Sequence, residues 1–153
     1  MSKYILREVK TRAEERVWLK VVRSIYKGYD KWVYPLDSDI CAVFDPAKNK
    51  KFTHGEAIRW YVIDSERGKA VGRIAAFYDR DAEEDYEQPT GGCGFFEAID
   101  SQEVANILFD ACREWLASKG MEAMDGPINF GARDAWWGLL VDGFDYEPLY
   151  TNP

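Results

Sequence analysis

The feature that most constrains the fold of this chain is a long amphipathic helix pattern between two β-rich runs. Cys93–Ile99 is predicted as a strand before the helix, and a second strand, interrupted by Gly126-Pro127, is predicted within residues 121–130. A strand, a helix and a strand in this order predict a parallel pair of strands that the helix connects. The apolar side chains of the helix recur three and four residues apart on one face, which must be buried: Val104, Ile107, Leu108, Ala111, Trp115 and Leu116.

The first half of the chain predicts more of the same sheet. Residues 4–9 are predicted to form a strand, and Thr11–Glu14 has the form of a capping box at the start of a helix that ends near Gly28. Two β-rich runs at 57–63 and 70–78 are joined by a glycine-containing turn and predict an antiparallel hairpin. Helices together with both parallel and antiparallel strand pairs predict the α/β (α+β) class.

Length, charge and composition exclude several classes of protein. The 153 residues amount to one domain, which we expect to span 1–153. A net charge of −7 repels phosphates and argues against nucleic acid as a partner. No run approaches the roughly 18 apolar residues of a membrane span, and the start shows no export signal, so we expect no membrane association and a cytoplasmic location. Three cysteines without metal-type spacing predict reduced thiols and no metal site.

Two stretches of sequence resemble the GNAT superfamily of N-acetyltransferases. Val71–Ala76 resembles the third strand of that fold, and Gly94–Asp100 followed by Glu103–Ala105 resembles its bulged fourth strand and the helix that follows. More narrowly, residues 95–145 are similar to the amino-terminal part of long bacterial GNAT-like proteins whose substrates are not established. The resemblance implies a mixed central sheet flanked by helices.

The resemblance also implies a donor and a place for it. Members of the superfamily transfer acetyl from acetyl-CoA to an amine, here the amine of a small molecule. They hold the CoA pyrophosphate at the start of the long helix through an Arg/Gln-x-x-Gly-x-Gly/Ala loop. The matching segment here shares only Ala105 with that loop, and Asp100 and Glu103 put carboxylates where the anion would bind. By position, the cofactor-binding residues are Ile99, Ser101, Val104 and Ala105.

Catalysis in the superfamily needs a base that takes the proton of the attacking amine. Glu97, on the fourth strand, is the candidate for this base; the alternative is a carboxylate that faces solvent or pairs with Arg73. Asn129, at the end of the fifth strand, is the candidate for orienting the substrate or a water molecule; the alternative is a turn residue after Gly-Pro.

Two functions therefore stay open at the level of sequence. One is an acyl-CoA N-acyltransferase, and the other is a non-catalytic GNAT-like binding or interaction domain with a degenerate pyrophosphate loop. In the resembling proteins, sequence like Tyr150–Pro153 continues into another helix and the closing strands, so we expect a domain that is incomplete at its C-terminus and lacks the last hairpin. A second copy, in a homo-oligomer, or a missing C-terminal segment would then cover the sheet edge.

Overall fold

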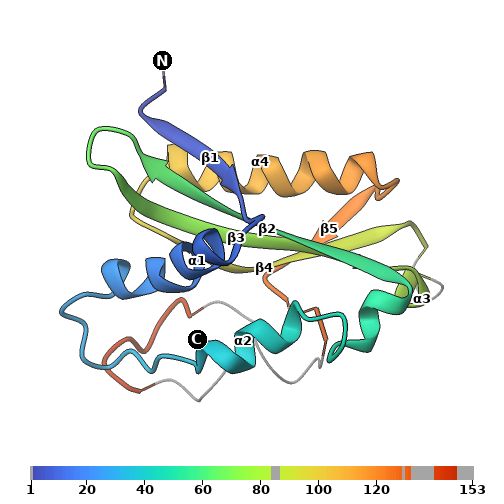
Figure 1. Cartoon of the computed structure of the whole chain (residues 1–153), viewed down its shortest axis with the longest axis horizontal. Helices are drawn as coiled ribbons and strands as arrows, with labels where there is room; N and C mark the ends of the chain where they lie inside the picture. The colour runs from blue at the N-terminus through green and yellow to red at the C-terminus, as the bar shows by residue number, and fades with distance from the viewer. Residues whose placement is uncertain (1, 84–86, 129, 132–139, 148–153) are drawn as a thin grey trace.

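A five-stranded mixed sheet forms the centre of the molecule, with helices on both faces (Figure 1). The computed structural model describes residues 2–83, 87–128, 130, 131 and 140–147. The strands lie in the order in which they occur in the chain; the first four are antiparallel, and the last pair is parallel. They are β1 (Tyr4–Glu8), β2 (Gly55–Asp64), β3 (Lys69–Asp79), β4 (Thr90–Ala98) and β5 (Ala123–Asp125).

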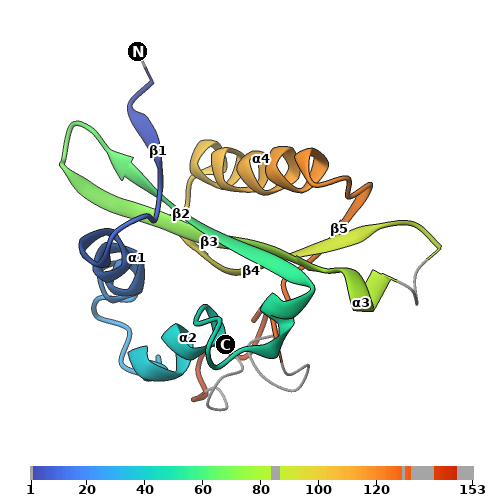
Figure 2. The same ribbon diagram turned by 45° about the vertical axis from the view of Figure 1, so that its right-hand side comes forward.

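The helices divide between the two faces of the sheet, as the turned view in Figure 2 shows. The long helix α4 covers one face, which we call the α4 face. Helices α1 and α2 cover the opposite face, which we call the α1 face. The helices are α1 (Arg12–Ile25), α2 (Asp37–Val43), the 3-10 helix η1 (Lys50–Thr53), the short α3 (Arg80–Glu83) and α4 (Gln102–Ser118).

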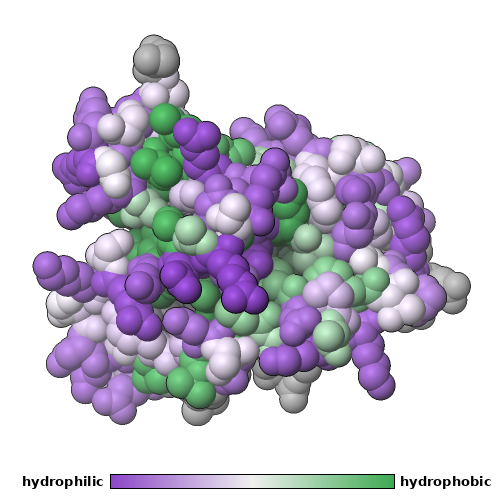
Figure 3. Space-filling view, in the orientation of Figure 1, coloured by the Kyte–Doolittle hydropathy of each residue, from purple (hydrophilic) through white to green (hydrophobic). Residues whose placement is uncertain are grey.

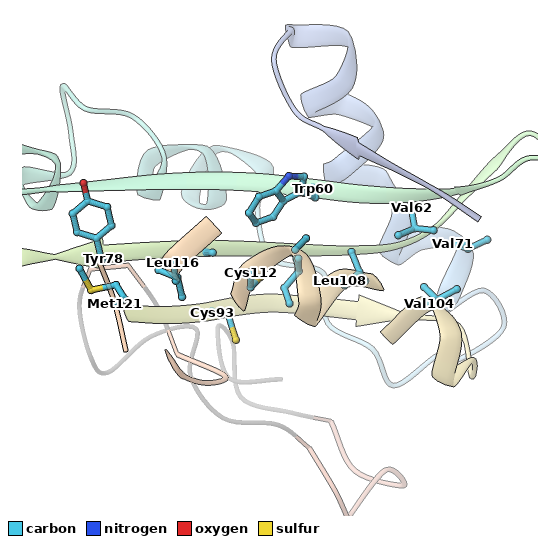
Figure 4. Packing of buried hydrophobic residues seen from close by; sticks show 13 residues of the cluster. Trp60, Val62, Val71, Tyr78, Cys93, Val104, Leu108, Cys112, Leu116 and Met121 are labelled. Carbon is cyan, nitrogen blue, oxygen red and sulfur yellow. The ribbon is translucent and has the colours of Figure 1, made fainter. Parts of the chain in front are cut away.

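The larger hydrophobic cluster lies between the sheet and α4 (Figure 4). Trp60 and Val62 are two residues apart on β2, so their side chains point to the same face, toward α4. The predicted apolar stripe of α4 meets them, with Val104 and Leu108 fully buried. The predicted strand, helix and strand are thus confirmed, and β4 and β5 pair in parallel.

A smaller cluster lies on the α1 face. Trp18 of α1 is fully buried and its indole Nε1 donates a hydrogen bond to the carbonyl of Ile74, 3.1 Å away. The other buried members of this cluster are Leu19 of α1, Ile40 of α2, Tyr61 of β2 and Ala75 of β3. Trp18 therefore fixes α1 to the middle of the sheet by both apolar burial and a hydrogen bond.

A β-bulge interrupts the pairing of β3 with β4. Arg73 pairs with Glu97 and Ala75 pairs with Gly94, so one residue of β3 lies opposite two residues of β4. The first of the two, Phe95, has a φ of 55°, a left-handed backbone conformation that is uncommon outside glycine. The bulged fourth strand implied by the family resemblance is present.

The bulge reverses which face the following side chains occupy, because side chains alternate along a strand. Cys93, before the bulge, belongs to the cluster on the α4 face, and so do Phe96 and Ala98 after it. Phe95 packs into the cluster on the α1 face. Glu97, between Phe96 and Ala98, therefore faces α1; without the extra residue it would face the apolar layer beneath α4.

The two long helices are capped in different ways. The Thr11–Glu14 capping box is present with both of its hydrogen bonds. Residues Asp100–Glu103 also have the sequence form of a capping box with Asp100 as the cap. The structure corrects this by one residue: Ser101 is the N-cap of α4, and its Oγ accepts a hydrogen bond from the N–H of Val104. Because one hydroxyl is enough to cap the helix, the carboxylates nearby are not needed for this purpose.

The last predicted strand is shorter than expected. β5 has three residues, pairs only with Thr90–Gly92 and ends before Gly126. In the described part of the chain it forms the outer edge of the sheet, opposite the β1 edge. The domain therefore has the mixed sheet that the sequence predicted, and this sheet is open at β5.

Candidate functional site

The candidate site is centred on Glu97, the first side chain after the bulge to face α1. Tyr26, at the C-terminal end of α1, donates a hydrogen bond from its phenolic oxygen to Glu97 Oε2, at 2.5 Å. The Glu97 side chain is partly buried. Within the described residues, Tyr26 is the only hydrogen-bond partner of this carboxylate. The contact joins two residues that are 71 positions apart in sequence, and it brings the end of α1 to strand β4.

Arg73 supplies the positive charge of the site. It is the cross-strand partner of Glu97 and is only 4% exposed. Its guanidinium lies over the Trp18 ring, 4.4 Å from the centroid, and its Nη1 donates to the Trp18 carbonyl at 3.3 Å. The described residues include no ion pair between Arg73 and Glu97 within 4.0 Å, and the buried Nε of Arg73 has no hydrogen-bond partner. The Arg73 charge therefore acts on Glu97 through space.

The protonation behaviour of the three groups follows from this burial. Desolvation raises the pKa of Glu97, while the Tyr26 hydrogen bond and the Arg73 charge oppose the rise. Desolvation lowers the pKa of Arg73 to about 10, so the guanidinium stays charged at neutral pH. Burial, together with the neighbouring Glu97 carboxylate, raises the pKa of Tyr26, so its phenol stays protonated. The carboxylate is thus a stronger base than a solvated one.

Tyr26 is held on both sides. Its backbone N–H donates to the carbonyl of Val22 at 2.9 Å and caps α1. Its ring stacks on Trp32 with the centroids 4.0 Å apart and the planes 10° from parallel. The turn between these two residues is closed by a hydrogen bond from the Tyr29 N–H to the Tyr26 carbonyl. The phenol is consequently positioned before any ligand binds.

The loop that contains Trp32 also contacts the segment 140–147. Tyr29 donates its hydroxyl to the carbonyl of Phe144, and Lys31 forms an ion pair with Glu147 at 3.6 Å. Figure 3 shows separate hydrophobic areas within the mostly hydrophilic face that Figure 1 presents. The loop that contains Trp32 and the segment 140–147 also hold six of the exposed large hydrophobic residues: Val33, Tyr34, Leu36, Val141, Phe144 and Tyr146.

The start of α4 does not suit a pyrophosphate. Ser101 Oγ already accepts the N–H of Val104 at 3.3 Å. Glu103 lies in the first turn, exposed, and accepts a hydrogen bond from the Ser2 hydroxyl at 3.3 Å. Asp100 is exposed just before the cap. These carboxylates stabilise the helix end by themselves and repel a second anion there, so the residues present do not fit the CoA pyrophosphate in the expected place.

The other predicted site residues fall into different environments. The Ile99 N–H donates to the carbonyl of Val71 at 2.9 Å and thus extends the sheet. The Val104 side chain is fully buried in the core. Ala105 donates its N–H within the helix, to the carbonyl of Ser101. Asn129 lies outside the described residues. The structure thus brings Glu97 to a polar cluster and brings the four predicted cofactor residues to the strand-to-helix connection.

Two residues of the site, Tyr26 and Trp32, are not recognisable as site residues from the sequence alone. Tyr26 directly follows a helix with a clear apolar stripe, and its spacing gives no sign of a contact with β4. Trp32 lies in a stretch without period. Only a tertiary contact joins these aromatic residues to Glu97. In the described part of the chain, no group of three His, Cys, Asp or Glu residues could hold a metal ion, and no helix has the length and apolar character to cross a membrane.

Two longer bacterial proteins are similar in sequence to nearly the whole chain. The chain is 30% identical to Protein YghO of Escherichia coli K12, over 97% of its own length and 37% of that protein. It is also 30% identical to the Bacterial ceramide synthase of Caulobacter vibrioides, over 95% of its own length and 39% of that protein. The chain spans less than two fifths of each relative. No protein-family model matches it.

One solved structure shows the fold. An aminoglycoside acetyltransferase from an uncultured soil metagenomic sample superposes with a TM-score of 0.56, covering 83% of this chain and 78% of that one, at 11% sequence identity. The chain therefore has the fold of this acetyltransferase, as the resemblance to the GNAT superfamily predicted, on a segment that is similar to part of longer bacterial proteins.

Proposed function

We propose that this domain transfers an acyl group from a thioester to an amine, with Glu97 as the base. The observation that carries the proposal is the position of Glu97: the bulge in β4 turns this carboxylate away from the apolar α4 face and into a partly buried polar cluster. A carboxylate with a raised pKa, held by the Tyr26 hydrogen bond beside the bulge, matches the needs of a general base.

The proposed reaction is the aminolysis of a thioester. The ammonium form of the acceptor gives its proton to the ionised Glu97. The nitrogen lone pair then attacks the thioester carbonyl, so the C–N bond forms and the C–S bond breaks. The sulfur leaves as a thiolate, and the second amine proton goes to water. Burial strengthens Glu97 as a base because it makes the protonated carboxyl relatively more stable.

The donor is proposed to be an acyl thioester whose phosphate groups are not bound at the start of α4. Asp100 and Glu103 disfavour an anion at that helix end. Acetyl-CoA remains the expected donor from the family resemblance, and the part of it that this domain can use is the thioester end. The test is therefore a comparison of thioesters with and without phosphate groups.

The acceptor is proposed to be an amine on an apolar chain. Exposed apolar side chains occur in the loop before α2, which holds the Trp32 ring against Tyr26, and in residues 140–147, which contact this loop through Tyr29 and Lys31. A ceramide is an amide of a fatty acid and a long-chain amine, and the Caulobacter relative bears the name ceramide synthase. Both observations favour an amphipathic primary amine over a highly polar one.

The first experiment measures thioester aminolysis by the purified chain with a series of primary alkylamines. Glu97→Gln is expected to lower kcat/KM by about 10²-fold, which is typical for the loss of a general base. Glu122→Gln, at an exposed glutamate, is the matched control and should change nothing. Equal rates for the wild type and Glu97→Gln would contradict the assignment of Glu97.

The second experiment compares acetyl-CoA with acetyl-pantetheine, which has the same thioester without the pyrophosphate. We expect similar kcat/KM values for both donors. Glu103→Gly combined with Asp100→Asn should raise the affinity for acetyl-CoA and leave that for acetyl-pantetheine unchanged, because only the first carries charge to the helix end. A strong preference of the wild type for acetyl-CoA would contradict this part of the proposal.

A non-catalytic GNAT-like binding domain is the second candidate, and the acidic start of α4 favours it. A bound ligand raises the melting temperature of the native state by mass action. If neither millimolar acetyl-CoA nor acetyl-pantetheine raises the Tm, and no alkylamine is acylated, the domain belongs to this second class. Binding of an alkylamine alone, seen as a Tm shift without turnover, would then identify the ligand.

A further inference from the structure

We propose that Tyr26 is a positioning residue for Glu97: its phenol fixes Glu97 Oε2 and leaves Oε1 to take the proton from the substrate. The inference rests on the proposed function for its meaning in catalysis, but the contact itself is a property of the free protein. It adds to the site a residue from α1, far from β4 in sequence.

Tyr26 is held rigidly in the folded protein. It caps α1, whose Trp18 is anchored to β3 by the hydrogen bond to the Ile74 carbonyl. Its ring is stacked face to face on Trp32. A side chain fixed by both a helix end and a ring stack has lost its rotamer freedom in the folded protein, so its hydroxyl binds the carboxylate with little further loss of entropy.

The phenol takes one oxygen of the carboxylate and leaves the other. Tyr26 Oη donates to Oε2. Among the residues that the structure describes, none donates a hydrogen bond to Oε1. Arg73 is buried beside the carboxylate but is directed to the Trp18 ring and carbonyl instead. The geometry therefore separates the two oxygens into a held one and an available one.

The hydrogen bond from Tyr26 lowers the pKa of Glu97. The groups that face Glu97 are Tyr26 from α1 and Arg73 from β3; both favour the ionised carboxylate, while desolvation opposes it. Tyr29 and Asp37 act only at one remove, on Tyr26 and Arg73 respectively. Loss of the Tyr26 hydroxyl leaves the desolvation in place, so the pKa of Glu97 must rise.

The experiment follows the Glu97 carboxyl by ¹³C NMR in protein labelled at the glutamate side chains, with the resonance assigned from its absence in Glu97→Gln. No donor or acceptor is present. Tyr26→Phe keeps the ring stack on Trp32 and removes only the hydroxyl. Tyr29→Phe is the matched control, since it removes a hydroxyl three residues away that bonds to the Phe144 carbonyl.

We expect the titration midpoint of Glu97 to move to higher pH in Tyr26→Phe and to stay in place in Tyr29→Phe. An unchanged midpoint in Tyr26→Phe, or an equal change in both variants, would overturn the inference. If Tyr26→Phe fails to fold, 3-fluorotyrosine introduced at position 26 gives the opposite test: a more acidic phenol is a stronger donor and should lower the midpoint.

The result is separable from the proposed function. If the midpoint moves but no thioester is ever aminolysed, the positioning contact stands and the acyltransferase proposal fails. If aminolysis is observed, the acid limb of its pH profile should move to higher pH in Tyr26→Phe by the same amount as the NMR midpoint. A purely structural role of Tyr26 would lower the rate at every pH without moving that limb.

Discussion

At the scale of the residue, the burial that makes the Glu97 carboxylate a stronger base also lowers the stability of the folded protein at neutral pH. The pKa of Glu97 in the folded protein is raised above the ordinary 4.5, with burial as the largest cause. A carboxyl with a raised pKa binds its proton more tightly in the folded state than in the unfolded state. Its contribution to stability is therefore fully present below about pH 4.5 and is lost as the pH rises through the folded-state pKa.

This linkage gives a test by thermal unfolding. Glu97→Gln mimics the neutral carboxyl at every pH, so we expect its Tm to exceed that of the wild type at neutral pH. The difference should shrink toward zero as the pH falls below about 4.5, where the wild-type carboxyl is protonated in both states. Scanning calorimetry between pH 4 and 8 measures it. A constant difference across this range would mean that the ionisation of Glu97 costs no stability.

At the scale of the element, Ser101 fixes the start of α4, and the bulge in β4 fixes the direction of Glu97. Ser101 was predicted as a cofactor-binding residue, and the structure shows its hydroxyl capping α4. Ser101→Ala should lower the free energy of unfolding by about 1 kcal/mol, as the loss of an N-cap does, without weakening the binding of acetyl-pantetheine. Ser101→Asp keeps the cap and should restore the stability. Urea unfolding and a binding titration separate the two effects.

Gly94 is the second element-scale test, because β4 runs close to the chain that follows β5. A Cβ at Gly94 would overlap the carbonyl oxygen of Ile128, which belongs to the backbone and cannot simply rotate away. Gly94→Ala should therefore destabilise the domain by roughly 1–3 kcal/mol, the usual cost of overpacking. Hydrogen exchange is the direct measurement: the Ile128 N–H, bonded to the Cys93 carbonyl at 3.0 Å, should exchange faster.

At the scale of the whole molecule, the sheet separates two apolar layers, and the candidate site lies on the α1 side only. Leu108 is fully buried in the layer beneath α4, and Trp18 is fully buried on the α1 face. Leu108→Ala should cost about 2–5 kcal/mol and Trp18→Ala roughly 3–5 kcal/mol. The losses are similar in size, but the two residues differ in what they support.

The prediction is that only the second substitution changes the site. The guanidinium of the buried Arg73 lies over the Trp18 ring. Trp18 also anchors helix α1, whose C-terminal cap is Tyr26. We therefore expect Trp18→Ala to move the Glu97 titration and Leu108→Ala to leave it in place, as long as each variant is folded at 25 °C. Urea unfolding and the ¹³C titration give both quantities on the same samples. Equal effects on Glu97 would show that the layers are coupled across the sheet.

Local patterns in the sequence determined the strands, the two long helices, the Thr11 capping box and the order that resembles an N-acetyltransferase, because period and capping chemistry act within a few residues. They also placed Glu97 on the fourth strand. Tertiary structure alone decided that Glu97 faces α1, that Tyr26 and Arg73 meet it and that Ser101 rather than Asp100 caps α4. The physical reason is that one extra residue in β4 reverses every later side chain, and the Tyr26–Glu97 contact spans 71 residues, beyond the reach of any local pattern.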